Sequence, residues 1–149
     1  MADMSPANTP ISDLARAAQD QFAQRPELLT LLATVSQDFA ASPAMEATLA
    51  NATKQIMAYM ETEAVSIFLL DDTGEHLTCL ACAGPVSIVG LTLDATQGIV
   101  GRSVSEDRVQ MVRDTAADSS FTGAVDNLTG FRTRSILCAP LKVKSRMLG

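Results

Sequence analysis

The chain has 149 residues, of which 47% are hydrophobic and 19% are charged, so it has the size of one domain and can bury a core. Its 11 basic residues against 17 acidic ones give a formal net charge of −6, which argues against binding of duplex DNA or an anionic membrane. Aromatic residues make up 4% and tryptophan is absent, which argues against a base-stacking single-strand binder. A small anion held by backbone N–H groups is compatible with this composition.

Cysteines occur at positions 79, 82 and 138 of a sequence with no signal-peptide pattern and no run of 18 apolar residues. We therefore expect reduced thiols, a cytoplasmic location and no membrane contact. Cys79 and Cys82 form a Cys-x-x-Cys pair in an extended stretch, where residues three apart are predicted to face opposite sides of a strand. No second Cys/His pair follows, and His76 is the only histidine. We predict a structural role for the pair, no metal site and no cofactor.

The first part of the chain predicts helices. Residues 1–25 have the pattern of a polar tail followed by a short helix that Ser12 can cap. Pro26 suits the first turn of a second helix, 26–41, and Ser42-Pro43 repeats this start signal before a third helix, 43–60. Apolar residues at helical spacing give each of these two helices one apolar face. This face is expected to pack against the core of the domain or against a second copy of the chain. These residues are Leu28, Leu32, Val35 and Phe39 in the first helix, and Met45, Leu49, Ala52, Ile56 and Met60 in the second.

From residue 64 onward the pattern changes to strands. Ala64–Leu70 is apolar on both faces, as in a covered strand, and the turn residues Asp71–Gly74 predict a hairpin. A helix is predicted to open at Gly98, and the polar run Asp114–Gly130 is expected to be functional or to contain a short helix. We expect an α+β fold with one antiparallel sheet and with helices 26–41 and 43–60 packed on one face. Its strands are 64–70, 76–83, 109–112 and 135–143, with a further short strand at 91–93.

Three segments stand out in order along the chain: AVSIFLLDDTGEHL, GIVGRSV and DNLTGFRTRSILCAPLKV. Together they resemble the GAF family, the small-molecule sensor domains of cyclic-nucleotide phosphodiesterases, adenylyl cyclases and many bacterial signalling proteins. They are similar to the family's first hairpin, to its ligand-facing helix, and to its penultimate strand with the preceding turn. The resemblance covers residues 26–149 and implies a sensor domain that lacks its C-terminal strand, because Met147–Gly149 look like the entry to that strand. It implies a piece of a longer signalling protein.

Gly98 and Gly101 let the chain turn tightly and leave the first N–H groups of the helix exposed, which favours an anion site. The resemblance implies a cyclic nucleotide here. Its eight ligand-binding residues are Ile99, Val100 and Gly101 near the phosphate, Phe121, Val125 and Thr129 near the base, and Asp114 and Thr133 in the same site. Alternatively, Ile99 and Val104 are core residues and the glycines are only helix caps. A Gly101→Val change is expected to block the phosphate and spare the fold, since a helix tolerates valine.

These features favour a regulatory domain that binds a small ligand and relays the binding signal to an output domain. A cyclic nucleotide is the candidate ligand. The helical stripes also predict a homodimer through the N-terminal helices. A ligand-free dimerisation module is the alternative. A third reading is an enzyme similar to the free methionine sulfoxide reductases. Ile99-Val100 and the loop 114–130 carry no cysteine where those enzymes have them, so we expect no catalysis.

Overall fold

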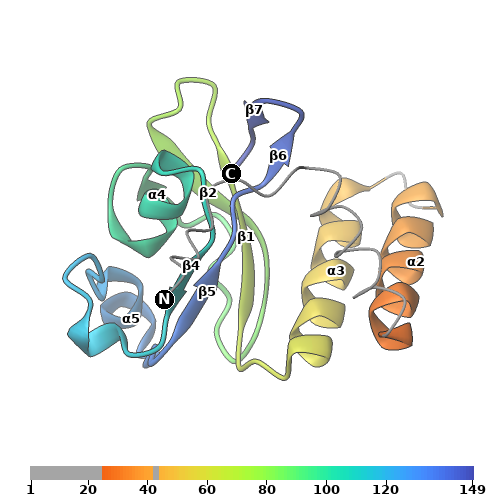
Figure 1. The fold of residues 1–149 in the computed structure, drawn as a ribbon, viewed down its shortest axis with the longest axis horizontal. Coiled ribbons are helices and arrows are strands. Elements are labelled where there is room, and N and C mark those ends of the chain that lie inside the picture. Colours follow the sequence, from red (N-terminus) through yellow and green to blue (C-terminus); the bar gives the residue numbers. More distant parts are fainter. Residues whose placement is uncertain (1–24, 42–43) are drawn as a thin grey trace, which may run out of the picture.

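The described part of the chain begins with two helices. The computed structural model describes residues 25–41 and 44–149, and Figure 1 shows its ribbon. Helix α2 spans Pro26–Ala41 and helix α3 spans Met45–Met60, which confirms both predicted helices. The tail and helix expected within residues 1–24 lie outside the described residues, and so does the Ser42-Pro43 start signal.

Helix α3 lies between α2 and the sheet (Figure 1). It packs against the first two strands and buries Thr48, Ala52 and Thr53. The two threonine hydroxyls donate to carbonyls of the preceding turn at 3.2 and 2.9 Å, which satisfies them in this buried interface. Helix α2 packs on α3 and buries none of its own residues. Leu32 and Phe39 are 48% and 49% exposed, so α3 leaves half of the predicted α2 stripe uncovered.

The strands pair in three separate antiparallel groups. In chain order they are β1 (Val65–Leu70), β2 (His76–Ala83), β3 (Thr92–Asp94), β4 (Gln110–Val112), β5 (Ile136–Cys138), β6 (Lys142–Val143) and β7 (Arg146–Met147). The main sheet has the order β1-β2-β3, while β4 pairs with β5 and β6 pairs with β7. The predicted hairpin and the antiparallel pairing are confirmed.

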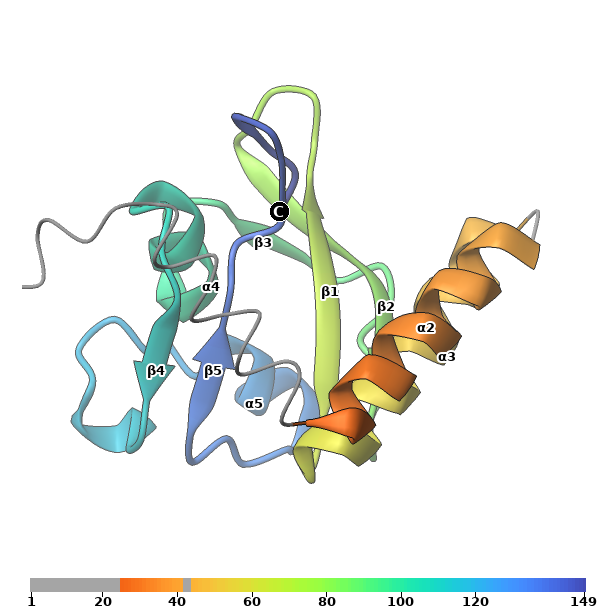
Figure 2. The same ribbon diagram turned by 45° about the vertical axis from the view of Figure 1, so that its right-hand side comes forward.

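The expectation of one continuous sheet is wrong. Figures 1 and 2 both show β5 running beside β1, but no ladder joins these strands within the described residues. The predicted strand 135–143 ends at Cys138, because Pro140 cannot donate a ladder hydrogen bond. On the second edge of β1, Leu70 N donates to the carbonyl oxygen of Leu148 at 2.8 Å. The last residues of the chain therefore touch β1 beyond its pairing with β2.

Three short helices connect these strands. The glycine-opened helix is α4, Gly98–Ser105. The polar run 114–130 contains a 3-10 turn, η1 (Thr115–Ala117), and a helix, α5 (Ala124–Thr129), as the length of that run predicted. Helix α4 packs against β4 and β5, and its residues Val100 and Val104 pack against the main core. That core consists of Phe68, Leu77, Cys79 and Ala95.

A β-bulge in β2 changes where its cysteines point. Ile67 lies opposite Ala81 and Phe68 lies opposite Cys79, so Leu80 is an extra residue on the bulged strand. Cys79 and Cys82 consequently pack in the same core cluster, and the prediction that they face opposite sides is wrong. Burial raises the pKa of the Cys79 thiol to about 11, with a further contribution from Cys82. Cys79 is fully buried and rarely ionised, so its thiol acts as a packing group in the core.

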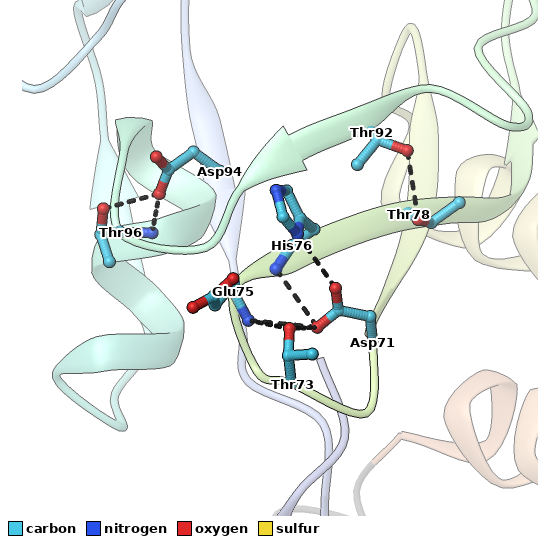
Figure 3. A network of polar contacts seen from close by, with 8 residues as sticks. All are labelled: Asp71, Thr73, Glu75, His76, Thr78, Thr92, Asp94 and Thr96. Atoms are coloured by element: carbon cyan, nitrogen blue, oxygen red, sulfur yellow. Dashed lines mark hydrogen bonds and ion pairs between the residues drawn. The ribbon is translucent and has the colours of Figure 1, made fainter.

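The hairpin turn between β1 and β2 is organised by one carboxylate (Figure 3). Asp71 Oδ1 accepts from the Thr73 hydroxyl at 2.8 Å and from Glu75 N at 3.1 Å. Asp71 Oδ2 lies 3.0 Å from Nδ1 of His76. The Thr73 hydroxyl, followed by His76, holds the pKa of Asp71 well below its usual range. The ionised carboxylate therefore stabilises this turn.

We expect an Asp71→Asn change to lower the unfolding temperature at neutral pH and to flatten its dependence on acid pH. Because folding lowers this pKa, the carboxylate's contribution is complete above the unfolded value of about 4 and is lost as the pH falls through the folded value. Thermal unfolding followed by circular dichroism from about pH 7 to about pH 2 should show the wild type and Asp71→Asn converging in acid. Asp72→Asn is the matched control, since the Asp72 side chain makes no hydrogen bond with the described residues. A constant gap between wild type and Asp71→Asn at every pH would contradict this.

Candidate functional site

A cavity of about 880 Å³ lies between β1 and the elements that follow the main sheet. Its walls include residues of β1, the start of α4, α5 with the segment before it, and β5. Figure 1 shows α4, α5 and β5 together on the side of β1 away from α2. Six of the eight predicted site residues line this cavity: Ile99, Val100, Phe121, Val125, Thr129 and Thr133. Gly101 and Asp114 do not belong to its lining.

The start of α4 lies at the cavity wall, and the amides of its first three residues have no acceptor among the described residues. Gln97 is extended and Gly98 has a φ of 71°, a conformation that glycine adopts without strain. Gly98, Ile99 and Val100 all line the cavity, and the first donor of the helix with a backbone acceptor is Gly101 N, which reaches the Gln97 carbonyl at 3.2 Å. Ile99 is 3% exposed, so it belongs to the packed interior as well as to the cavity wall. The start of α4 therefore combines an apolar wall with backbone donors.

Gly101 serves the fold rather than the cavity surface. A Cβ atom at this position would lie 2.9 Å from the Ala95 carbonyl oxygen and 2.9 Å from the carbonyl carbon of Thr96. These backbone atoms belong to the turn that leads into α4, and a side chain on Gly101 would force the helix away from it. The expectation that Gly101→Val spares the fold is therefore wrong.

Asp114 also has a structural partner. Its Oδ1 accepts from Ala116 N at 3.0 Å and caps η1. Next to it, Thr115 N donates to the Arg134 carbonyl at 2.9 Å, and the Thr115 hydroxyl donates to the Thr133 carbonyl at 2.7 Å. These bonds join the end of β4 to the approach to β5. Asp114 thus starts the wall segment without reaching the cavity.

A carboxylate that the sequence reasoning missed, Asp126, positions Thr133 of the site, while backbone groups position Thr129. Asp126 accepts from Thr133 N at 2.7 Å and from the Thr133 hydroxyl at 2.6 Å. The Thr129 hydroxyl donates to the Val125 carbonyl at 2.8 Å and accepts from Phe131 N at 3.2 Å. Both hydroxyl oxygens are therefore fixed at the cavity wall. The DNLTGFRT stretch carried this signal, because an aspartate seven residues before a threonine can close such a turn.

Two arginines of the cavity wall carry unpaired charge. Arg113 and Arg134 both line the cavity, and neither forms an ion pair with any residue that the structure describes. The sequence reasoning stressed the net charge of −6 and missed how the charges are distributed. Eight of the eleven basic residues lie between positions 102 and 146. The cavity lining contains these two exposed cations, which have no ion-pair partner among the described residues, together with the carboxylates of Glu63, Asp94 and Asp126.

Within residues 25–41 and 44–149, none of the helices has the length and apolar character that a bilayer span requires. No group of three or more histidine, cysteine, aspartate or glutamate side chains in that part of the chain is arranged to hold a metal ion.

Comparison with known proteins identifies the family. The model of the GAF domain family matches residues 44–149, which is well over half of the sequence. The chain belongs to the GAF domain family, and the resemblance in the three sequence segments is confirmed. GAF domains are generally regulatory sensor domains that bind small ligands and are parts of larger signalling proteins.

Several solved structures share the fold. The GAF domain of a phosphoenolpyruvate-protein phosphotransferase from Coxiella burnetii has a TM-score of 0.73 and 20% identity, covering 82% of this chain and 73% of that one. A free methionine-R-sulfoxide reductase from Neisseria meningitidis, solved with its substrate, has a TM-score of 0.66 and 18% identity, covering 99% and 77%. Residues 122 to 287 of a methyl-accepting chemotaxis protein have a TM-score of 0.64 and 19% identity, covering 80% and 81%. At these identities the likeness shows the fold.

Proposed function

We propose that this domain is a sensor that binds a small anionic ligand in the cavity beside β1 and relays its presence to an output domain. The observation that carries the proposal is the pair Arg113 and Arg134, which line the cavity without ion-pair partners among the described residues. Two cations without ion-pair partners favour an anionic group beside them. The lining also holds three carboxylates, and two of these, Asp94 and Asp126, already accept hydrogen bonds from Thr96 and Thr133. Backbone donors at the start of α4 add to the same preference.

A cyclic nucleotide is the ligand class we propose. A phosphate would lie against the amides of Ile99 and Val100, and a base would contact the apolar side chains of Phe121 and Val125. Thr129 and Thr133 offer fixed hydroxyl oxygens for polar groups of the ligand. In this assignment Gly101 and Asp114 support the site from behind its wall. The identity of the base rests on the resemblance to phosphodiesterase-type GAF domains alone.

Calorimetric titration of the chain with cyclic AMP and with cyclic GMP tests this function. We expect binding of at least one nucleotide, and we expect Arg134→Gln to weaken it by roughly tenfold or more, since a charge-assisted hydrogen bond contributes about 1.5–3 kcal/mol. Arg132→Gln is the matched control, because Arg132 is exposed and lies outside the cavity lining. No heat and no thermal shift with either nucleotide would favour the ligand-free dimerisation module instead.

The cavity also contains thiols, which an enzyme related to the sulfoxide reductases would use. Cys82 and Cys138 line the cavity, a placement that the sequence reasoning did not anticipate. Burial raises the pKa of Cys138, which lowers its reactivity, and His76 is not part of the lining. A thiol without a neighbouring base is a poor nucleophile. We therefore propose binding rather than catalysis.

We propose further that the domain forms a homodimer through α2. Leu29, Leu32 and Phe39 lie on one side of this helix and are each about half exposed, at 48%, 48% and 49%. Leu28 and Val35 are less exposed, so the surface offered to a partner is narrower than the predicted stripe. An exposed apolar strip along a helix suits a two-fold helix pair.

A further inference from the structure

The cavity wall formed by residues 116–124 is attached to the rest of the molecule in an unusual way. Its backbone hydrogen bonds stay local: Asp118 N reaches the Thr115 carbonyl at 3.3 Å, and Phe121 N reaches the Asp118 carbonyl at 3.0 Å. Ser120 N donates to Asp118 Oδ1 at 2.9 Å, again within the segment. None of these bonds holds the segment against α4 or the sheet.

Among the described residues, one side chain from outside the segment forms hydrogen bonds with its side chains. Arg102 on α4 donates to both carboxylate oxygens of Asp118, from Nη1 at 3.2 Å and from Nη2 at 2.9 Å. The same Nη1 donates to the Ser120 hydroxyl at 3.0 Å. The Arg102 and Asp118 side chains are only 26% and 19% exposed. This two-pronged contact is far better shielded from water than the pair of Arg108 with Glu106, whose side chains are 70% and 42% exposed.

We infer that Arg102 is a positioning residue, which holds the 116–124 segment against α4 and thereby fixes one wall of the cavity. Phe121 and the residues that follow it up to Asp126 line the cavity, and Arg102 itself does not. Arg102 acts on the site through Asp118 and Ser120. Without its guanidinium, the hydrogen bonds given above leave the segment free to separate from α4.

The backbone at the two ends of the segment allows residues 116–124 to move as a unit. Gly123 adopts a φ of 63° at the junction with α5, and Asp114 caps the turn at the other end. Residues beyond these points are held independently, by Thr115 on the β5 side and by Asp126 at Thr133. Loss of the Arg102 contact should therefore loosen residues 116–124 and leave α5 and the strands in place. A role of this segment in controlling ligand access to the cavity rests on the proposed function.

Amide hydrogen exchange on the ligand-free chain tests the inference directly. We expect the amides of Asp118, Ser120 and Phe121 to exchange roughly tenfold faster in Arg102→Gln than in the wild type, because a shielded two-pronged ion pair restrains local opening. The amide of Cys79, which donates to the Leu91 carbonyl inside the main sheet, should keep its rate. Arg108→Gln removes a charge near the same helix end without touching the segment, and it should leave all these rates unchanged.

Asp118→Asn removes the charge of the other partner in the same contact. It provides a second test in case Arg102→Gln misfolds. It should accelerate the same amides, and the double variant should be no faster than either single variant, since both remove one contact. Arg102→Lys keeps the charge but loses the fork, and it should give an intermediate rate. Unchanged rates at Ser120 and Phe121, or an equal rise at Cys79, would overturn the inference. The readout needs no ligand, so it stands or falls separately from nucleotide binding.

Discussion

Gly101→Val is expected to lower the free energy of unfolding by about 3 kcal/mol or more, the upper range for forcing extra atoms into a packed site. The first added atom already meets the Ala95 carbonyl oxygen and the Thr96 carbonyl carbon at 2.9 Å. Backbone atoms cannot swing aside as the end of a side chain can. For a chain of this length, the unfolding temperature should fall by roughly 10 °C. Urea and thermal denaturation followed by circular dichroism measure both quantities.

Gly101→Ala separates close packing from helix propensity. In an exposed helix, alanine in place of glycine stabilises by about 1 kcal/mol. Here the same change should destabilise, because a single Cβ suffices for the collision. Gly90→Ala provides the matched control, since a Cβ there has open space and only its φ of 85° is unfavourable. A Gly101→Ala variant as stable as the wild type would show that α4 can shift freely against the 95–96 turn.

Leu32→Glu is expected to weaken self-association roughly 100-fold. Each dimer would lose two copies of a half-buried leucine contact of about 1 to 1.5 kcal/mol, and every 1.4 kcal/mol changes the dissociation constant tenfold. Two carboxylates would also meet across the two-fold axis. Sedimentation velocity over a micromolar concentration series measures the change. Leu32 is 48% exposed, so the monomer itself should keep its fold and its far-ultraviolet circular dichroism.

Gln37→Glu adds the same charge to the same helix and serves as the control. Helical spacing puts position 37 about 130° around α2 from the strip of Leu29, Leu32 and Phe39. Its dimer should therefore associate as the wild type does. A chain that sediments as a monomer at all concentrations, with Leu32 intact, would contradict the proposed dimer.

The sequence predicted those elements whose pattern depends on local forces. Pro26 and the stripe after it set the bounds of α2, and the turn residues after Leu70 set the first hairpin. The order of elements also sufficed to recognise the family. The single sheet was wrong because pairing depends on which strand edges meet, and a run of apolar residues does not record this. The bulge at Leu80 could not be predicted either. One unpaired residue changes the face of the strand on which the following residues lie, and no pattern in the sequence indicates it.

The resemblance brought six of the eight residues proposed for the site to the wall of one cavity, whereas Gly101 and Asp114 lie outside its lining. A glycine within a helix start looks the same in sequence whether it approaches a ligand or another backbone segment. Arg113, Arg134 and Arg102 went unnoticed because a charge reveals its role only when its partners, or their absence, are placed in space.

The missing ladder between β5 and β1 has a mechanical consequence. Backbone hydrogen bonds stiffen a domain most where they are continuous, and the cavity lies where that continuity is interrupted. A guest that touches β1 on one side and α5 on the other would restrict the relative motion of the two halves. Helix α3 packs on β1 and β2, and α2 packs on α3. Binding would then change the amplitude of motion of α2 through the packed side chains of α3. The average structure of the domain would stay nearly constant.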